Sequence, residues 1–137
     1  MQLYLPSVYY IDVGAKILLI EDEPFVSDLY SHELKTAGYD VKIITDGTAG
    51  LKAMDEETFD LVLLDIMLPG MNGLDILRTW RSKHKDSKLP VILLTNLGQD
   101  NVISEGFRIG AQGYMIKANY KPNKVLEEVQ RILSESK

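Results

Sequence analysis

The sequence predicts an α/β fold built as a doubly wound parallel sheet, and two observations lead to this prediction. First, short apolar runs typical of buried strands alternate along the chain with segments whose apolar residues recur at helical spacing. Second, residues 61–64 form an unbroken apolar run, as expected of a strand that is buried on both faces of a parallel sheet. Repeated βα units of this size place helices on both faces of such a sheet.

Five strands and five helices are expected after residue 15. The strands are expected at residues 16–20, 39–45, 61–65, 90–95 and 114–117. The second strand is the most polar, which favours the flavodoxin-like (βα)5 strand order 2-1-3-4-5, because that order puts it at an edge. The inward-facing helix residues are expected to be Val26, Leu29, Tyr30, Leu34 and Ala37; Ala49, Ala53 and Met54; Leu74, Leu77 and Trp80; Val102, Ile103 and Phe107; Val125, Leu126, Val129, Ile132 and Leu133.

Composition limits the classes of function. The 137 residues suffice for one domain, and 45% hydrophobic with 26% charged residues is ordinary for a globular protein. A net charge of −5 argues against direct nucleic-acid binding, and no apolar run is long enough for a membrane span. The absence of cysteine excludes disulfides and thiolate metal sites and fits a cytoplasmic protein. His32 and His84 are expected to be partly exposed helix residues.

Residues 1–15 stand apart from the alternating pattern. They lack a basic start and a sustained apolar core, so they make a poor signal peptide. We expect an N-terminal arm or an expression leader here, with an extra strand as the alternative, and a single folded domain at residues 16–137. The chain ends just after the last expected helix, which suggests either a stand-alone domain or a fragment of a longer regulator.

Polar residues follow the predicted strands at the points where they end. Glu21 and Asp22 follow the first strand, Asp65 ends the third, Thr95 ends the fourth and Lys117 ends the fifth. Parallel strands bring these ends to one edge, where ligands bind in open α/β folds. Clustered carboxylates repel one another unless they share a cation, and all-oxygen ligands favour Mg2+, with Mn2+ as the alternative. A carboxylate beside such an ion and a lysine is suited to attack phosphorus.

Four motifs, ILLIEDEP, LVLLDIMLPGMNG, VILLT and GYMIK, occur in an order and at a spacing that resemble the receiver domain of a two-component response regulator. The resemblance covers residues 16–135. It implies that Asp65 is the phospho-accepting aspartate, with Asp22 as a direct Mg2+ ligand and Glu21 as the second acid. The backbone carbonyl of Met67 would complete the protein's share of the metal ligands.

The resemblance also implies a switch. Thr95 matches the hydroxyl that moves to the phosphoryl group, Lys117 the lysine that pairs with it, and Tyr114 the aromatic residue whose rotamer follows Thr95. The expected donor is a sensor histidine kinase or a phosphotransfer protein. The fourth helix, fifth strand and fifth helix would contact an output domain or protein, and a homodimer is left open. Such a domain catalyses its own phosphorylation and slow dephosphorylation at Asp65 without being a metabolic enzyme.

Two positions depart from the family pattern. Ala118 stands where proline usually follows the lysine, so we expect a trans Lys117–Ala118 bond, and Asn96 replaces a small residue near the phosphoryl pocket. Met67 and Leu97 stand where fast-hydrolysing family members place polar side chains that orient water. The sequence therefore predicts a long-lived phosphorylated state.

Three other functions fit this pattern less well. A haloacid-dehalogenase-type phosphatase has its nucleophilic aspartate after the first strand, whereas here the acid pair comes first. A flavodoxin needs a glycine- and hydroxyl-rich phosphate loop after that strand, where this chain has the acidic residues 21–23. A phosphate-independent pseudo-receiver, acting only as a protein-interaction module, is disfavoured by the complete set of site residues but kept open by Asn96 and Ala118.

Overall fold

The computed structural model describes residues 2–4, 10–12, 14–96, 100–117 and 122–135. A parallel sheet of five strands forms its centre, in the order β4-β3-β5-β6-β7. This is the predicted order 2-1-3-4-5 when the strands of this sheet are numbered along the chain. The strands are β3 (Lys16–Ile20), β4 (Asp40–Ile44), β5 (Leu61–Asp65), β6 (Val91–Thr95) and β7 (Gly113–Ile116). The helices are α1 (Pro24–Thr36), α2 (Gly47–Glu56), α3 (Gly73–Lys83), α4 (Asp100–Arg108) and α5 (Pro122–Glu135).

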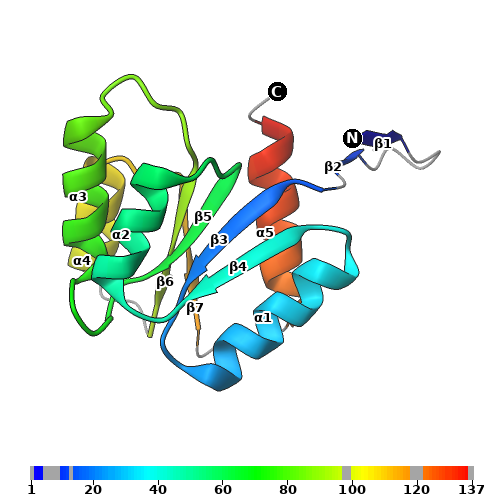
Figure 1. Cartoon of the computed structure of the whole chain (residues 1–137), viewed down its shortest axis with the longest axis horizontal. Coiled ribbons are helices and arrows are strands. Elements are labelled where there is room, and N and C mark those ends of the chain that lie inside the picture. The colour runs from blue at the N-terminus through cyan, green and yellow to red at the C-terminus, as the bar shows by residue number, and fades with distance from the viewer. Residues whose placement is uncertain (1, 5–9, 13, 97–99, 118–121, 136–137) are drawn as a thin grey trace.

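The helices cover both faces of the sheet (Figure 1). Alternate residues of β3 enter different cores, since successive strand side chains point to opposite faces. Ile17 and Leu19 pack with α1 and α5, whereas Leu18 and Ile20 pack with α2 and α3. All five residues of β5 and of β6 are buried, while β4 is only partly buried at its edge. The expectation of a polar second strand at an edge is confirmed.

Two predictions about helix faces are wrong, and both have the same cause. Phe107 and Ala49 were expected to face inward, but both are exposed. In each case the neighbouring glycine lies against the sheet instead. A Cβ atom on Gly106 would lie 2.3 Å from Leu93 Cδ1, and one on Gly50 would lie 2.7 Å from Ile20 Cδ1. The helix backbones approach the sheet so closely there that a Cβ atom would force the buried Leu93 or Ile20 side chain to shift, and the adjacent side chains turn outward.

The described part of the N-terminal segment forms a small hairpin. Strands β1 (Gln2–Tyr4) and β2 (Tyr10–Asp12) pair with each other in antiparallel register. They form a separate two-stranded sheet, so the alternative of an added strand on the main sheet is not observed for these residues. Strand β2 lies against α5, as Figure 1 shows near the C-terminal end of the chain.

Candidate functional site

The carboxyl ends of the strands bring the predicted site residues together. Glu21 and Asp22 follow β3, Asp65 is the last residue of β5, Thr95 is the last residue of β6, and Lys117 follows β7. The strand register aligns these ends, because Ile20 pairs with Leu64, Asp65 with Leu94, and Thr95 with Ile116. The predicted convergence of these residues at one sheet edge is therefore observed. Glu23 lies beside them, and we call the four carboxylates of Glu21, Asp22, Glu23 and Asp65 the acidic cluster.

Lys117 binds three of the four carboxylates of the acidic cluster. Its side chain is fully buried, and its Nζ atom donates hydrogen bonds to Glu21 Oε1 at 2.9 Å, Glu23 Oε1 at 2.9 Å and Asp65 Oδ2 at 3.1 Å. Glu21 and Asp65 are also buried, at 0% and 1% exposure. Buried charges are costly unless they are paired and hydrogen-bonded, so these contacts are what allow the ammonium and the two carboxylates to share one buried site.

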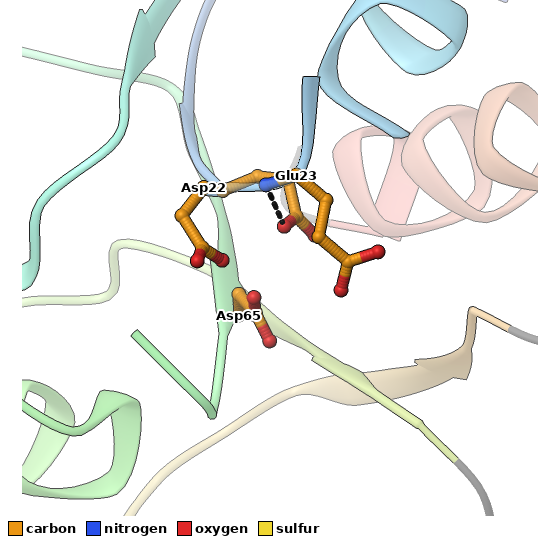
Figure 2. Close-up of side chains that lie close together, drawn as sticks. Asp22, Glu23 and Asp65 are labelled. Atoms are coloured by element: carbon orange, nitrogen blue, oxygen red, sulfur yellow. Dashed lines mark hydrogen bonds between the residues drawn. The ribbon is translucent and has the colours of Figure 1, made fainter. Parts of the chain in front are cut away.

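Backbone amides complete the hydrogen bonding of the buried carboxylates. The amide of Glu23 donates to Glu21 Oε2 at 3.0 Å, which is the dashed line in Figure 2, and the amide of Met67 donates to Asp65 Oδ1 at 3.2 Å. Each buried carboxylate therefore binds Lys117 through one oxygen and a backbone amide through the other. The side chain of Met67 is exposed beside this site.

Burial and the neighbouring charges shift the pKa values of Asp65 and Lys117. Burial raises the pKa of Asp65 most, the neighbouring Glu21 charge raises it further, and Lys117 lowers it, with a net value of about 7 against the ordinary 3.8. Burial alone would lower the pKa of Lys117, but its hydrogen bonds to Glu21 and Glu23 and the charge of Asp65 raise it above its usual range. The ammonium therefore stays protonated, and it does not fully offset the acids around it.

The donor set suits a hard divalent cation. Glu21, Asp22, Glu23 and Asp65 each offer one carboxylate oxygen, and these oxygens all lie within 4.8 Å of one another. Figure 2 shows Asp22, Glu23 and Asp65 around a common space. Carboxylate oxygens are the ligands that Mg2+ and Mn2+ prefer, and one lysine leaves the cluster with excess negative charge. The residues present therefore fit the metal ion that the sequence predicts.

The two predicted switch residues lie on neighbouring strands with different exposure. Thr95 is buried at the end of β6, whereas Tyr114 on β7 is 42% exposed. The Tyr114 ring packs edge-on against Phe107 of α4, with 6.0 Å between the ring centroids. The outward turn of Phe107 thus creates an aromatic contact between α4 and β7 on the face predicted to bind a partner.

Sequence reasoning missed the contact of Glu23 with Lys117. Glu23 was visible only as part of an acidic run before Pro24, and its partner is 94 residues away. The predicted trans bond at Lys117–Ala118 and the position of Leu97 lie outside the described residues. Asn96 is described and is exposed. No helix among the described residues is long and apolar enough to cross a membrane.

Solved structures define the class of this fold as a receiver domain. The chemotaxis response regulator CheY4 of Vibrio cholerae is similar with a TM-score of 0.80 and 28% identity, over 88% of this chain and 99% of that one. The BeF3-activated receiver domain of DrrB is similar with a TM-score of 0.77 and 34% identity, over 89% of this chain and 99% of that one.

The sequence comparisons give the family. A family model described as the response regulator receiver domain matches residues 17–130, so this chain belongs to that family. The DNA-binding response regulator MtrA of Mycolicibacterium smegmatis is 36% identical over 115 residues, which cover 84% of this chain and 49% of MtrA. The chain therefore spans about half the length of this curated relative.

Proposed function

We propose that this chain is a phosphorylation-activated signalling switch. Asp65 accepts a phosphoryl group from a histidine kinase or a phosphotransfer protein, and the modification changes the face formed by α4, β7 and α5, which controls a partner. The observation that carries the proposal is the buried contact between Lys117 and Asp65 within the acidic cluster. An ion pair that served only packing would not need further carboxylates around it, since these raise its cost.

The proposed reaction transfers the phosphoryl group in one displacement. A carboxylate oxygen of Asp65 attacks phosphorus and forms an O–P bond, while the P–N bond to the donor histidine breaks and its electron pair stays on the ring nitrogen. Lys117, 3.1 Å from Asp65, neutralises charge on the transferring group. A divalent ion held by Glu21, Asp22, Asp65 and the Met67 carbonyl would supply further positive charge there.

The switch then depends on Thr95 and Tyr114. We propose that the Thr95 hydroxyl moves toward the phosphoryl oxygens and that the Tyr114 ring changes rotamer in response. That change would break the edge-on contact with Phe107 and alter the surface between α4 and β7. Phosphorylation thereby shifts an equilibrium between two pre-existing states of this face.

The partners are part of the proposal. MtrA is described as DNA-binding and is about twice as long as the matched region. We propose that an output region, in the same polypeptide or in a separate protein, binds the face of α4, β7 and α5. With a net charge of −5, this chain itself is not proposed to bind nucleic acid or a membrane. The proposed location is the cytoplasm, which fits the cysteine-free sequence.

Labelling with a small phosphodonor tests the proposal. The protein is incubated with acetyl phosphate and Mg2+, and intact mass spectrometry measures the added phosphoryl group. We expect labelling that requires Mg2+ and is abolished in Asp65→Asn, which keeps the size of the side chain but removes the nucleophilic oxygen. Equal labelling of parent and variant would contradict the assignment of Asp65. Absence of labelling in the parent would instead favour the phosphate-independent interaction module.

A further inference from the structure

Glu23 contacts Lys117 from the solvent side of the cluster. The Glu23 side chain is 47% exposed, yet its Oε1 atom lies 2.9 Å from the fully buried Nζ of Lys117. The other two acids bound to Lys117, Glu21 and Asp65, are both buried. Glu23 is therefore the one partner of this triplet that water can reach directly.

The position of Glu23 in the fold leaves its side chain available for this contact. Glu23 is the N-cap residue of α1, but its side chain makes no capping hydrogen bond in the described structure. Asp46 and Asn72, the N-cap residues of α2 and α3, accept hydrogen bonds from the backbone amides of Ala49 and Leu74. Pro24, which follows Glu23 at the first helical position, has no amide hydrogen to donate.

The three contacts use the full donor capacity of Lys117. An ammonium group has three N–H donors, and Glu21, Glu23 and Asp65 each accept one. A phosphoryl oxygen that is to bind Lys117 must therefore replace one of these acceptors. Glu21 is buried and held by the Glu23 amide, and Asp65 is the residue that carries the phosphoryl group. The Glu23 carboxylate costs least to displace, since it can return to water.

We infer that Glu23 is a positioning residue that holds Lys117 in the unphosphorylated protein and is displaced from it by the incoming phosphoryl group. The inference rests on the proposed function of Asp65. Glu23 then acts against phosphorylation in two ways, because its carboxylate occupies a donor of Lys117 and also repels the negative phosphoryl group. Glu23 thus sets how readily the site is modified, while its backbone amide continues to hold Glu21.

Two substitutions separate the contact of Glu23 with Lys117 from the negative charge of Glu23. Glu23→Gln keeps the length of the side chain and an oxygen that can accept from Lys117, but removes the charge. Glu23→Ala removes both the charge and the contact. From the strength of a partly exposed ion pair, we expect labelling by acetyl phosphate to be about 1.5- to 5-fold faster in Glu23→Ala and to rise less in Glu23→Gln. The matched control is Asp28→Asn, which removes one exposed acid from the same helix.

Two binding measurements distinguish positioning from other roles. Calorimetry gives the affinity of each protein for Mg2+ alone and for beryllofluoride in the presence of Mg2+. Because the proposed metal ligands are Glu21, Asp22, Asp65 and the Met67 carbonyl, while the Glu23 carboxylate binds Lys117, we expect Mg2+ affinity to stay within about twofold. Beryllofluoride should bind more tightly in Glu23→Ala by the same factor as labelling is accelerated. A merely structural role would lower the thermal midpoint without tightening beryllofluoride binding.

The outcomes are distinct. Faster labelling and tighter beryllofluoride binding in both Glu23 variants, with Asp28→Asn like the parent, would support the inference. Unchanged or slower labelling of the Glu23 variants would overturn the inference and leave the proposed function intact. Loss of Mg2+ affinity in these variants would do the same, because Glu23 would then be a metal ligand. Equal acceleration in Asp28→Asn would reduce the effect to net charge and overturn the inference. A parent that takes no phosphoryl group would overturn both.

Discussion

Replacing Asp65 by asparagine should stabilise the metal-free protein at neutral and alkaline pH. Asp65 is buried beside Glu21, and these surroundings raise its pKa to about 7 from 3.8. The folded state therefore binds a proton that the unfolded state has already released. Stability is lost as the pH rises from the unfolded pKa to the folded pKa, that is, between about pH 4 and pH 7. Asparagine removes this loss, because it has no charge to be buried.

The size of this change in stability follows from the rise in the pKa of Asp65. Each pKa unit corresponds to ~1.4 kcal/mol, so a rise of about three units costs the folded protein on the order of 4 kcal/mol once Asp65 is ionised. Asparagine keeps an oxygen that can accept from Lys117, although this contact is weaker than the ion pair. We therefore expect Asp65→Asn to raise the unfolding free energy at pH 8 by about 2–4 kcal/mol without metal.

Urea unfolding followed by circular dichroism measures this difference. Parent and Asp65→Asn are compared near pH 5 and near pH 8, with a chelator and with Mg2+. Near pH 5 the unfolding free energies of the two proteins should differ little. Near pH 8, Mg2+ should reduce the difference in unfolding free energy, because it stabilises only the parent. Asp40→Asn, which removes an exposed strand acid, is the control and should show little change. A parent whose stability does not fall between these pH values would refute the reasoning.

Three further predictions concern the residues around Asp65. Lys117→Met should destabilise the metal-free protein by about 3–5 kcal/mol, as its removal leaves buried carboxylates unpaired, and Mg2+ should restore part of the loss in thermal unfolding. Gly73→Ala places a Cβ atom 2.2 Å from the backbone oxygen of Asp65. Its strain should cost about 1–3 kcal/mol in urea unfolding and slow labelling of Asp65; unchanged labelling would show that the loop yields elsewhere. Met67→Asn should speed loss of the phosphoryl group after donor removal by about tenfold or more, since an exposed amide there can orient water, whereas an unchanged decay rate would contradict that role.

Strand ends were the most informative sequence feature. Apolar runs place β5 and β6 in the buried centre of the sheet, and a polar residue ends each run at Asp65 and Thr95. Parallel pairing then requires these ends to share one edge, because every strand of the sheet runs in the same direction. Together with Glu21, Asp22 and Lys117, most of the candidate site could therefore be predicted from local patterns and one topological rule.

Tertiary structure decided which neighbours face the sheet and which acid reaches the lysine. Phe107 is exposed because Gly106 allows α4 to approach Leu93 closely, a choice that helical spacing cannot show, since apolar side chains are favoured at either position. Glu23 binds Lys117 because it is the N-cap residue of α1, at the sheet edge where β7 ends, and its side chain is not used in capping the helix. Sequence thus determined the residues available at this edge through strand burial and chain direction, whereas the packing of α1 and α4 determined which of them touch.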